Sequence, residues 1–189
     1  MYDTLKNGRT QFIARPAGGV TKVEVAGAHT NWMPVAMKRR ADGTYQATVK
    51  LPPGARGLDF GSGPTSSLAR LFTEAGRPCA SHDLYYASDP AALSVRHDFV
   101  VCCEALEHFR QPAAEFARML AALKPGGWLG VMTQLRDEAA VPFAAWFYKN
   151  DLTHISFHSR RSAAHLAAVH GLSLEAHPWG VSLFQSRAS

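Results

Sequence analysis

The chain has 189 residues, 47% of them hydrophobic and 19% charged, and its formal net charge is +5. This length accommodates one domain of ordinary size with a small addition, and the composition is that of a globular protein rather than a disordered one. No stretch approaches the ~20 consecutive apolar residues of a membrane span, and residues 1–10 lack the apolar core of a signal peptide. We therefore expect a cytoplasmic protein without a membrane segment.

Cysteine usage and charge distribution narrow the function classes further. Cys79, Cys102 and Cys103 cannot all pair, and two of them are adjacent in an apolar run, which favours buried free thiols over a disulfide or a metal site. The positive residues are scattered apart from Lys38–Arg40, a triplet typical of a solvated turn. The charge permits an acidic partner without indicating one.

Short β-type runs separated by turn signals make up the first part of the chain, at residues 11–14, 22–26 and 45–51. We expect the last two runs to flank the turn of a hairpin-like unit. The composition changes at Pro52–Gly54, which is the best boundary. The sequence thus predicts a small β segment over residues 1–54 and a second domain over residues 55–189.

Beyond this boundary, strand-like and helix-like segments alternate, the pattern of a parallel sheet covered by helices. The apolar runs predict strands at residues 57–60, 78–83, 99–103, 128–132, 172–176 and 181–185. Helices are predicted at residues 65–75, 112–123 and 162–169. The expected fold class is α/β: a Rossmann-like, mostly parallel sheet with helices on both faces, preceded by the small β segment.

The first of these strands ends in a carboxylate and leads into a glycine loop, since residues 57–64 are Gly-Leu-Asp-Phe-Gly-Ser-Gly-Pro. Such a loop lets backbone N–H groups approach a nucleotide-type cofactor. In a dinucleotide site, Ser66 would be a third glycine and Asp59 would repel the pyrophosphate, so an NAD-dependent oxidoreductase is disfavoured. Asp59 suits instead a cationic ligand such as S-adenosylmethionine, which carries an ammonium and a sulfonium.

Further motifs follow in order along the chain. Asp83 ends the second strand, residues 98–108 finish in Leu-Glu-His, and residues 123–129 are Leu-Lys-Pro-Gly-Gly-Trp-Leu. With the glycine loop, these motifs make residues 57–185 resemble the class I S-adenosylmethionine-dependent methyltransferases. The resemblance implies an enzyme that transfers a methyl group from S-adenosylmethionine to a small-molecule acceptor.

The resemblance also implies which residues hold the cofactor. The backbone of Gly61 and Gly63 would contact its methionine portion, Asp83 would accept hydrogen bonds from the ribose hydroxyls, and Leu84 or Tyr85 would pack on adenine. The full expected cofactor-binding set is Asp59, Gly61, Ser62, Gly63, Asp83, Leu84 and Glu104. For Asp83, a simple turn acid is the alternative interpretation.

One departure from the family concerns the short segment between Asp83 and Asp98. Only 14 residues separate these two acids, so the usual third strand is compressed or missing. Asp89 is the only carboxylate in between, and we assign no adenine contact to it.

Transfer to a hydroxyl acceptor would benefit from a general base, and the candidate catalytic residues are Glu107, His108 and His154. The alternatives are a structural loop pair for Glu107 and His108, and a surface or supporting histidine for His154. His158 follows His154 by four residues, but residues 155–157 disfavour a helix, so no metal site is expected.

Nucleic acid is not the favoured substrate. Pro78-Cys79 resembles the dipeptide of cytosine C5 methyltransferases, yet in those enzymes the nucleophile follows the fourth strand, whereas Cys79 lies in the second. The Asn/Asp-Pro-Pro-Tyr motif of methyltransferases that act on amino groups of bases is absent. The expected partner is a small-molecule acceptor, and the oligomeric state is left open.

Residues 11–54 resemble the first half of a glycogen- or starch-binding module of the immunoglobulin-like sandwich type, in which Trp32 would stack on sugar. The strands that complete such a sandwich do not follow, and half a sandwich leaves an open core. A small β lid, a partner-contacting flap, and a recombined or engineered junction are therefore alternatives. The corresponding alternative function is a glucan-binding module fused to a degenerate Rossmann-like scaffold.

Overall fold

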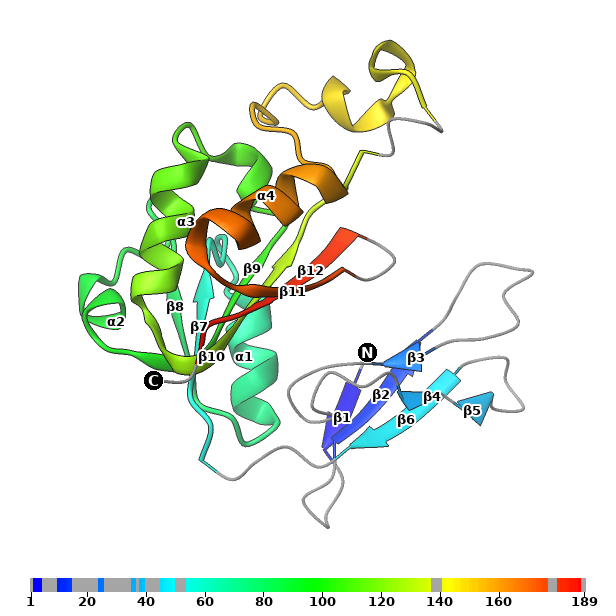
Figure 1. The fold of residues 1–189 in the computed structure, drawn as a ribbon. Helices are drawn as coiled ribbons and strands as arrows, with labels where there is room; N and C mark the ends of the chain where they lie inside the picture. The colour runs from blue at the N-terminus through cyan, green and yellow to red at the C-terminus, as the bar shows by residue number, and fades with distance from the viewer. Residues whose placement is uncertain are drawn as a thin grey trace. The chain divides into compact units, whose positions relative to one another are not determined.

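The computed structural model describes residues 54–136, 141–176 and 180–187, and the backbone of six strands within residues 2–49 (Figure 1). The chain forms two compact units, Met1–Ala55 with Thr73–Arg77, and Arg56–Phe72 with Pro78–Ser189. The predicted boundary after residue 54 stays a prediction. None of the described helices has the length and apolar character that a membrane span requires.

The first unit contains short antiparallel strands. Four strands pair in the order β1-β2-β6-β5, and two more, β3 and β4, pair with each other. Their bounds are β1 Tyr2–Thr4, β2 Thr10–Ala14, β3 Glu24–Val25, β4 Val35–Ala36, β5 Lys38–Arg39 and β6 Tyr45–Val49. The predicted hairpin between residues 22–26 and 45–51 is wrong, because β3 pairs with β4 while β6 pairs with β2 and β5. Trp32 lies outside the described residues.

The second unit is built on a six-stranded sheet in the order β11-β12-β10-β9-β7-β8. The bounds are β7 Gly57–Phe60, β8 Cys79–His82, β9 His97–Cys103, β10 Leu123–Met132, β11 Ser173–Ala176 and β12 Val181–Gln185. Strands β8, β7, β9 and β10 are parallel to one another, and β12 is antiparallel to both β10 and β11. The predicted α/β, Rossmann-like and mostly parallel sheet is confirmed.

Helices pack against this sheet and supply its core. They are α1 Ser67–Glu74, α2 Pro90–Ser94, α3 Pro112–Ala121 and α4 Arg160–His170. Phe116 of α3 is fully buried against Phe184 of β12, with ring centroids 5.1 Å apart. Strand β7 is buried along its whole length, as expected for a strand covered on both faces. The three cysteines are free thiols, of which Cys102 is buried as predicted, whereas Cys79 and Cys103 are only partly buried.

The compressed segment between β8 and β9 forms helix α2 rather than a strand. Asp89 caps this helix, since its side chain accepts a hydrogen bond from the Ala92 N–H at 3.1 Å, and Pro90 occupies the first helical position. The structure therefore gives Asp89 a helix-capping contact. The Asp-Pro pair was a local signal for a helix start that the sequence analysis did not use.

Strand β10 begins five residues before its predicted start. Leu123 pairs with His97 and Trp128 pairs with Phe99, so residues 124–127 bulge out between two registers. The Lys-Pro-Gly-Gly turn thus lies within an irregular strand rather than before it.

Ser159 should stabilise α4, the helix that follows the segment bearing His154. Its hydroxyl accepts from the Ser162 N–H at 3.3 Å while the Ser162 hydroxyl accepts from the Ser159 N–H at 2.9 Å, a reciprocal capping box. We expect Ser159→Ala to lower the free energy of unfolding by about 1 kcal/mol, measured by urea denaturation. Ser159→Asp, which retains an acceptor, should stay near the wild type, and equal stability of both variants would contradict the cap.

Candidate active site

The residues singled out in the sequence lie mainly where the parallel strands of the sheet end. The glycine loop follows β7, Asp83 follows β8, Glu104 follows β9 and Thr133 follows β10. Because the carboxyl ends of parallel strands meet at one edge, this is the edge at which open α/β sheets bind ligands.

The glycine loop adopts a backbone that only glycine accepts readily. Gly61 and Gly63 have φ angles of 77° and 63°, in the left-handed region that disfavours residues with a Cβ. A Cβ on Gly61 would also lie 2.6 Å from the Cβ of Ala105, and the Gly61 N–H donates to the carbonyl of His82 at 2.8 Å. The loop is thus held close to β8 and to the segment after β9.

Asp83 ties the glycine loop to the turn that follows β8. Its Oδ2 accepts from the Gly63 N–H at 3.0 Å, and its Oδ1 accepts from the Tyr85 and Tyr86 N–H groups at 2.9 and 3.1 Å. A carboxylate offers about four acceptor positions, so three backbone donors leave roughly one. Two ribose hydroxyls would therefore compete with at least one of these N–H groups.

Asp59 lies beneath the loop, only 2% exposed. Its Oδ2 accepts from the Ala69 N–H of α1 at 3.1 Å. Burial raises the pKa of Asp59 to about 6; the Ala69 N–H opposes this rise and the negative charge of Asp83 adds to it. The carboxyl group therefore connects β7 to the helix after the loop, and its predicted contact with a cationic ligand stays a prediction.

The remaining residues of the predicted cofactor set are more exposed. The hydroxyl of Ser62 lies 3.1 Å from that of Ser66, the residue at the position of a third glycine, which has a φ of 44°. Leu84, Tyr85 and Tyr86 expose 66%, 81% and 66% of their surface directly after Asp83. Such apolar side chains beside a carboxylate suit a flat aromatic base next to a ribose.

Glu104 directly follows β9 and has a φ of 47°, an uncommon conformation for a residue with a side chain. Strain of this kind costs roughly 1–3 kcal/mol and clusters at functional sites. The Tyr148 hydroxyl lies 3.0 Å from Glu104 Oε2. Burial raises the pKa of Glu104, the Tyr148 hydroxyl lowers it, and the nearby Glu107 raises it again.

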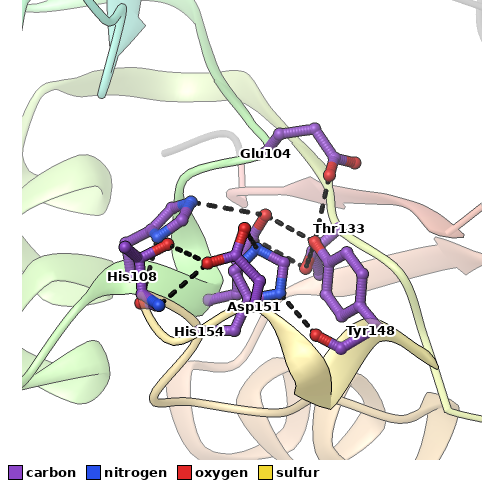
Figure 2. A network of polar contacts seen from close by, with 8 residues as sticks. Glu104, His108, Thr133, Tyr148, Asp151 and His154 are labelled. Carbon is purple, nitrogen blue, oxygen red and sulfur yellow. Dashed lines mark hydrogen bonds and ion pairs between the residues drawn. The ribbon is translucent and has the colours of Figure 1, made fainter. Parts of the chain in front are cut away.

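Glu107 is fully buried in the short 3-10 helix η2 (Leu106–His108) and accepts two hydroxyl hydrogen bonds. Thr133 donates to Oε2 at 2.8 Å, and Tyr148 lies 2.5 Å from Oε1 (Figure 2). The single hydrogen of Tyr148 faces both Glu107 and Glu104, so it satisfies only one carboxylate at a time. The Tyr148 hydroxyl therefore links the two acids through hydrogen bonds that alternate with each other.

The segment after η4 (Phe147–Asn150) is fastened to the backbone of Glu107. The carbonyl of Glu107 accepts from the N–H groups of Ile155 and Ser156 at 2.9 and 3.0 Å. Aromatic packing fixes the same region, since the Trp146 ring lies 5.3 Å from that of Tyr148 and 5.6 Å from that of Phe157. These contacts bring His154 to the end of β9.

His108 and His154 both present an unprotonated ring nitrogen in their neutral forms. His108 Nδ1 lies 3.1 Å from the Thr153 carbonyl, and His154 Nδ1 lies 2.7 Å from the Tyr148 carbonyl. A carbonyl can only accept, so each Nδ1 carries the hydrogen and each Nε2 keeps a lone pair. The two rings meet edge to face, with centroids 4.9 Å apart.

The three predicted catalytic candidates thus lie in one cluster, in which Figure 2 labels His108 and His154. One ligand atom each of Glu107, His108 and His154 lie within 4.8 Å of one another. His154 Nε2 also lies 3.8 Å from Oδ2 of Asp151. As expected, the stretch from His154 to His158 is not helical.

Sequence reasoning missed Thr133, Tyr148 and Asp151. Thr133 directly follows β10, a position that could have indicated it. Tyr148 and Glu107 are 41 residues apart, and no local pattern connects them.

Comparisons with known proteins agree with this architecture. Residues 35–177 match a family model described as a methyltransferase domain. An O-methyltransferase family protein from Burkholderia thailandensis superposes with a TM-score of 0.54 at 15% identity, over 71% of this chain and 51% of that one. The chain thus spans about half the length of that protein. No curated protein matches the sequence.

Two further solved structures share the fold. The 1,6-didemethyltoxoflavin-N1-methyltransferase of Burkholderia thailandensis, solved with 1,6-didemethyltoxoflavin and S-adenosylhomocysteine, has a TM-score of 0.51 at 17% identity, covering 71% of this chain and 72% of that one. The [4+2]-cyclase SpnF has a TM-score of 0.51 at 14% identity, covering 74% and 78%. At these identities the likeness establishes the fold and not the reaction.

Ionisation of Asp59 should make folding stability depend on pH. The pKa of Asp59 is raised from 3.8 to about 6 in the folded chain. Between these two pH values the folded chain therefore keeps a proton on Asp59 that the unfolded chain has lost. Stability from this group is therefore greatest below about pH 4 and falls as pH rises through about 6, by about 3 kcal/mol in total.

This dependence is measurable by urea denaturation across that range. Asp59→Asn, which cannot ionise, should gain about 3 kcal/mol relative to the wild type between about pH 4 and pH 7. Glu115→Gln on α3 is the control and should follow the wild type. If the free energy of unfolding depended on pH in the same way for the wild type and Asp59→Asn, the pKa of Asp59 would not be raised in the folded chain.

Proposed function

The chain belongs to the methyltransferase domain family, and we propose that it transfers a methyl group from S-adenosylmethionine to a nucleophilic group of a small-molecule acceptor. The methyl donor is supported by the family and by the S-adenosylhomocysteine bound in the N1-methyltransferase neighbour. The donor supplies a methyl carbon already activated by a positively charged sulfur. The protein has to hold that cation, position the acceptor and exclude water.

The observation that carries the proposal is the joining of the glycine loop to Asp83 at adjacent strand ends. Gly61 and Gly63 have no side chain to block a ligand, although their N–H groups already donate to His82 and Asp83, and Ser62 between them adds a hydroxyl. Asp83 and the exposed Leu84 would hold the nucleoside portion. The residues present fit the donor, because a glycine-rich loop lies beside the carboxyl groups of Asp59 and Asp83, which suit the positive charge of the donor.

The acceptor side would be the cluster of Glu107, His108 and His154. An Nε2 lone pair on either histidine can take the proton that a hydroxyl or amine acceptor releases. Glu107 is fully buried and already bonded to Thr133 and Tyr148, so we assign it a positioning function. No observation on the described residues favours the glucan-binding alternative.

Asp83 is the residue that tests the donor site. We expect Asp83→Ala to weaken the binding of S-adenosylmethionine and S-adenosylhomocysteine by about 10-fold or more, or about 1.4 kcal/mol, measured by titration calorimetry. Asp83→Asn should weaken it less, because one acceptor oxygen remains. Circular dichroism verifies that both variants fold.

The matched control is Asp98→Asn, which removes another carboxylate, one bonded to Lys124 at 2.8 Å near the start of β9. This variant should bind the donor normally. Unchanged affinity in Asp83→Ala would remove Asp83 from the site. Failure of the wild type to bind either compound, with binding of NAD or a maltooligosaccharide instead, would refute the proposed function.

A further inference from the structure

Two imidazole nitrogens and one carboxylate oxygen converge at the end of β9, on Glu107, His108 and His154. A set of two histidines and one glutamate is a ligand set of zinc in catalytic sites, where a fourth position stays open. We propose that these three side chains bind a divalent transition-metal ion of the zinc class. From the sequence no metal site was expected, because the spacing of His154 and His158 does not suggest a partner as distant as Glu107 or His108.

Both histidines are oriented as metal ligands commonly are. Nδ1 of each ring donates to a backbone carbonyl, of Thr153 for His108 and of Tyr148 for His154. Such bonds select the tautomer in which Nε2 is the free ligand atom and hold the ring in place. The carbonyls belong to the segment fastened to Glu107, so the chain itself fixes both rings (Figure 2).

Glu107 is equally constrained. Thr133 and Tyr148 orient its carboxylate, and its Oε1 lies 4.0 Å from His108 Nε2. Burying a carboxylate charge is costly unless an opposite charge or hydrogen bonds compensate. A bound cation would compensate this charge at the point where the two imidazoles converge.

The ligand atoms need a small movement to bind an ion. In a tetrahedral site with metal–ligand bonds of about 2.1 Å, the ligand atoms lie roughly 3.4 Å from one another. In this structure the ligand atoms of the three residues lie within 4.8 Å of one another, so they would have to move closer together. The His108 side chain is 39% exposed and the His154 side chain 10% exposed, so His108 has room to turn. Asp151 is exposed, and its Oδ2 lies 3.8 Å from His154 Nε2.

A metal ion here would act on the acceptor. Resting on the proposed function, the ion would lower the pKa of an acceptor hydroxyl bound at the open position. The released proton would pass to water, because both histidine Nε2 lone pairs would hold the ion instead of taking the proton. Metal binding itself does not depend on the methyl donor and is tested without it.

The test uses the full chain after treatment with a chelator. Titration with Co²⁺, followed by its visible absorption, and with Zn²⁺, followed by calorimetry, should show one ion per chain. His108→Ala and His154→Ala should each weaken binding by about 10-fold or more, since each removes a ligand worth more than ~1.4 kcal/mol. Glu107→Gln should do the same wherever circular dichroism shows it folded.

Controls separate this cluster from other metal ligands. His165→Ala, an exposed position on α4, and Cys103→Ser should bind as the wild type does. Absence of binding, binding undiminished in both histidine variants, or a cobalt spectrum with thiolate charge transfer would overturn the proposal. The same variants should bind S-adenosylmethionine with wild-type affinity, measured by calorimetry. If the wild type itself does not bind S-adenosylmethionine, this would count against the proposed function and leave the metal result intact.

Discussion

The buried carboxyl group of Glu107 is the point on which the arrangement of the candidate acceptor side depends. Its side chain accepts from Thr133 after β10 and Tyr148 in η4, while its backbone carbonyl accepts from Ile155 and Ser156. One residue thus joins two strand ends to a segment more than 40 positions later. Loss of its hydrogen bonds would leave a buried polar group unsatisfied and would release the loop that carries His154.

Negative charge is concentrated at this edge of the sheet although the whole chain has a net charge of +5. Asp59, Asp83, Glu104 and Glu107 come from the ends of three adjacent strands. Their mutual repulsion contributes to the raised pKa values of Asp59, beside Asp83, and of Glu104, beside Glu107. A cationic ligand would relieve this repulsion, which fits a sulfonium donor on one side and a metal ion on the other.

Local signals in the sequence predicted most of the second unit because its strands are short, apolar and bounded by glycine or proline; β7 and β12 have the predicted bounds. Strand pairing in the first unit was not predicted correctly, since period-two runs pair equally well with several partners. His108 meets His154 through a hydrogen bond to the Thr153 carbonyl, 45 residues along the chain, which leaves no local pattern. The positions of the sequence motifs thus indicated where the candidate site lies, whereas the contacts between its residues are seen only in the folded chain.

The similar solved structures bear on whether the donor side or the acceptor side of the candidate site determines the reaction. A methyltransferase and a [4+2]-cyclase share this fold at similar TM-scores, so the sheet and its strand order do not specify chemistry. The glycine loop and Asp83 concern only how a cofactor is held. On the proposed function, the capacity to take a proton or to polarise an acceptor would lie in His108 and His154, whose ring orientations follow from backbone carbonyls rather than from the sheet. On the proposed function, the segment from η4 to α4 would therefore help to select the acceptor, because its contacts with Glu107 hold that segment in place.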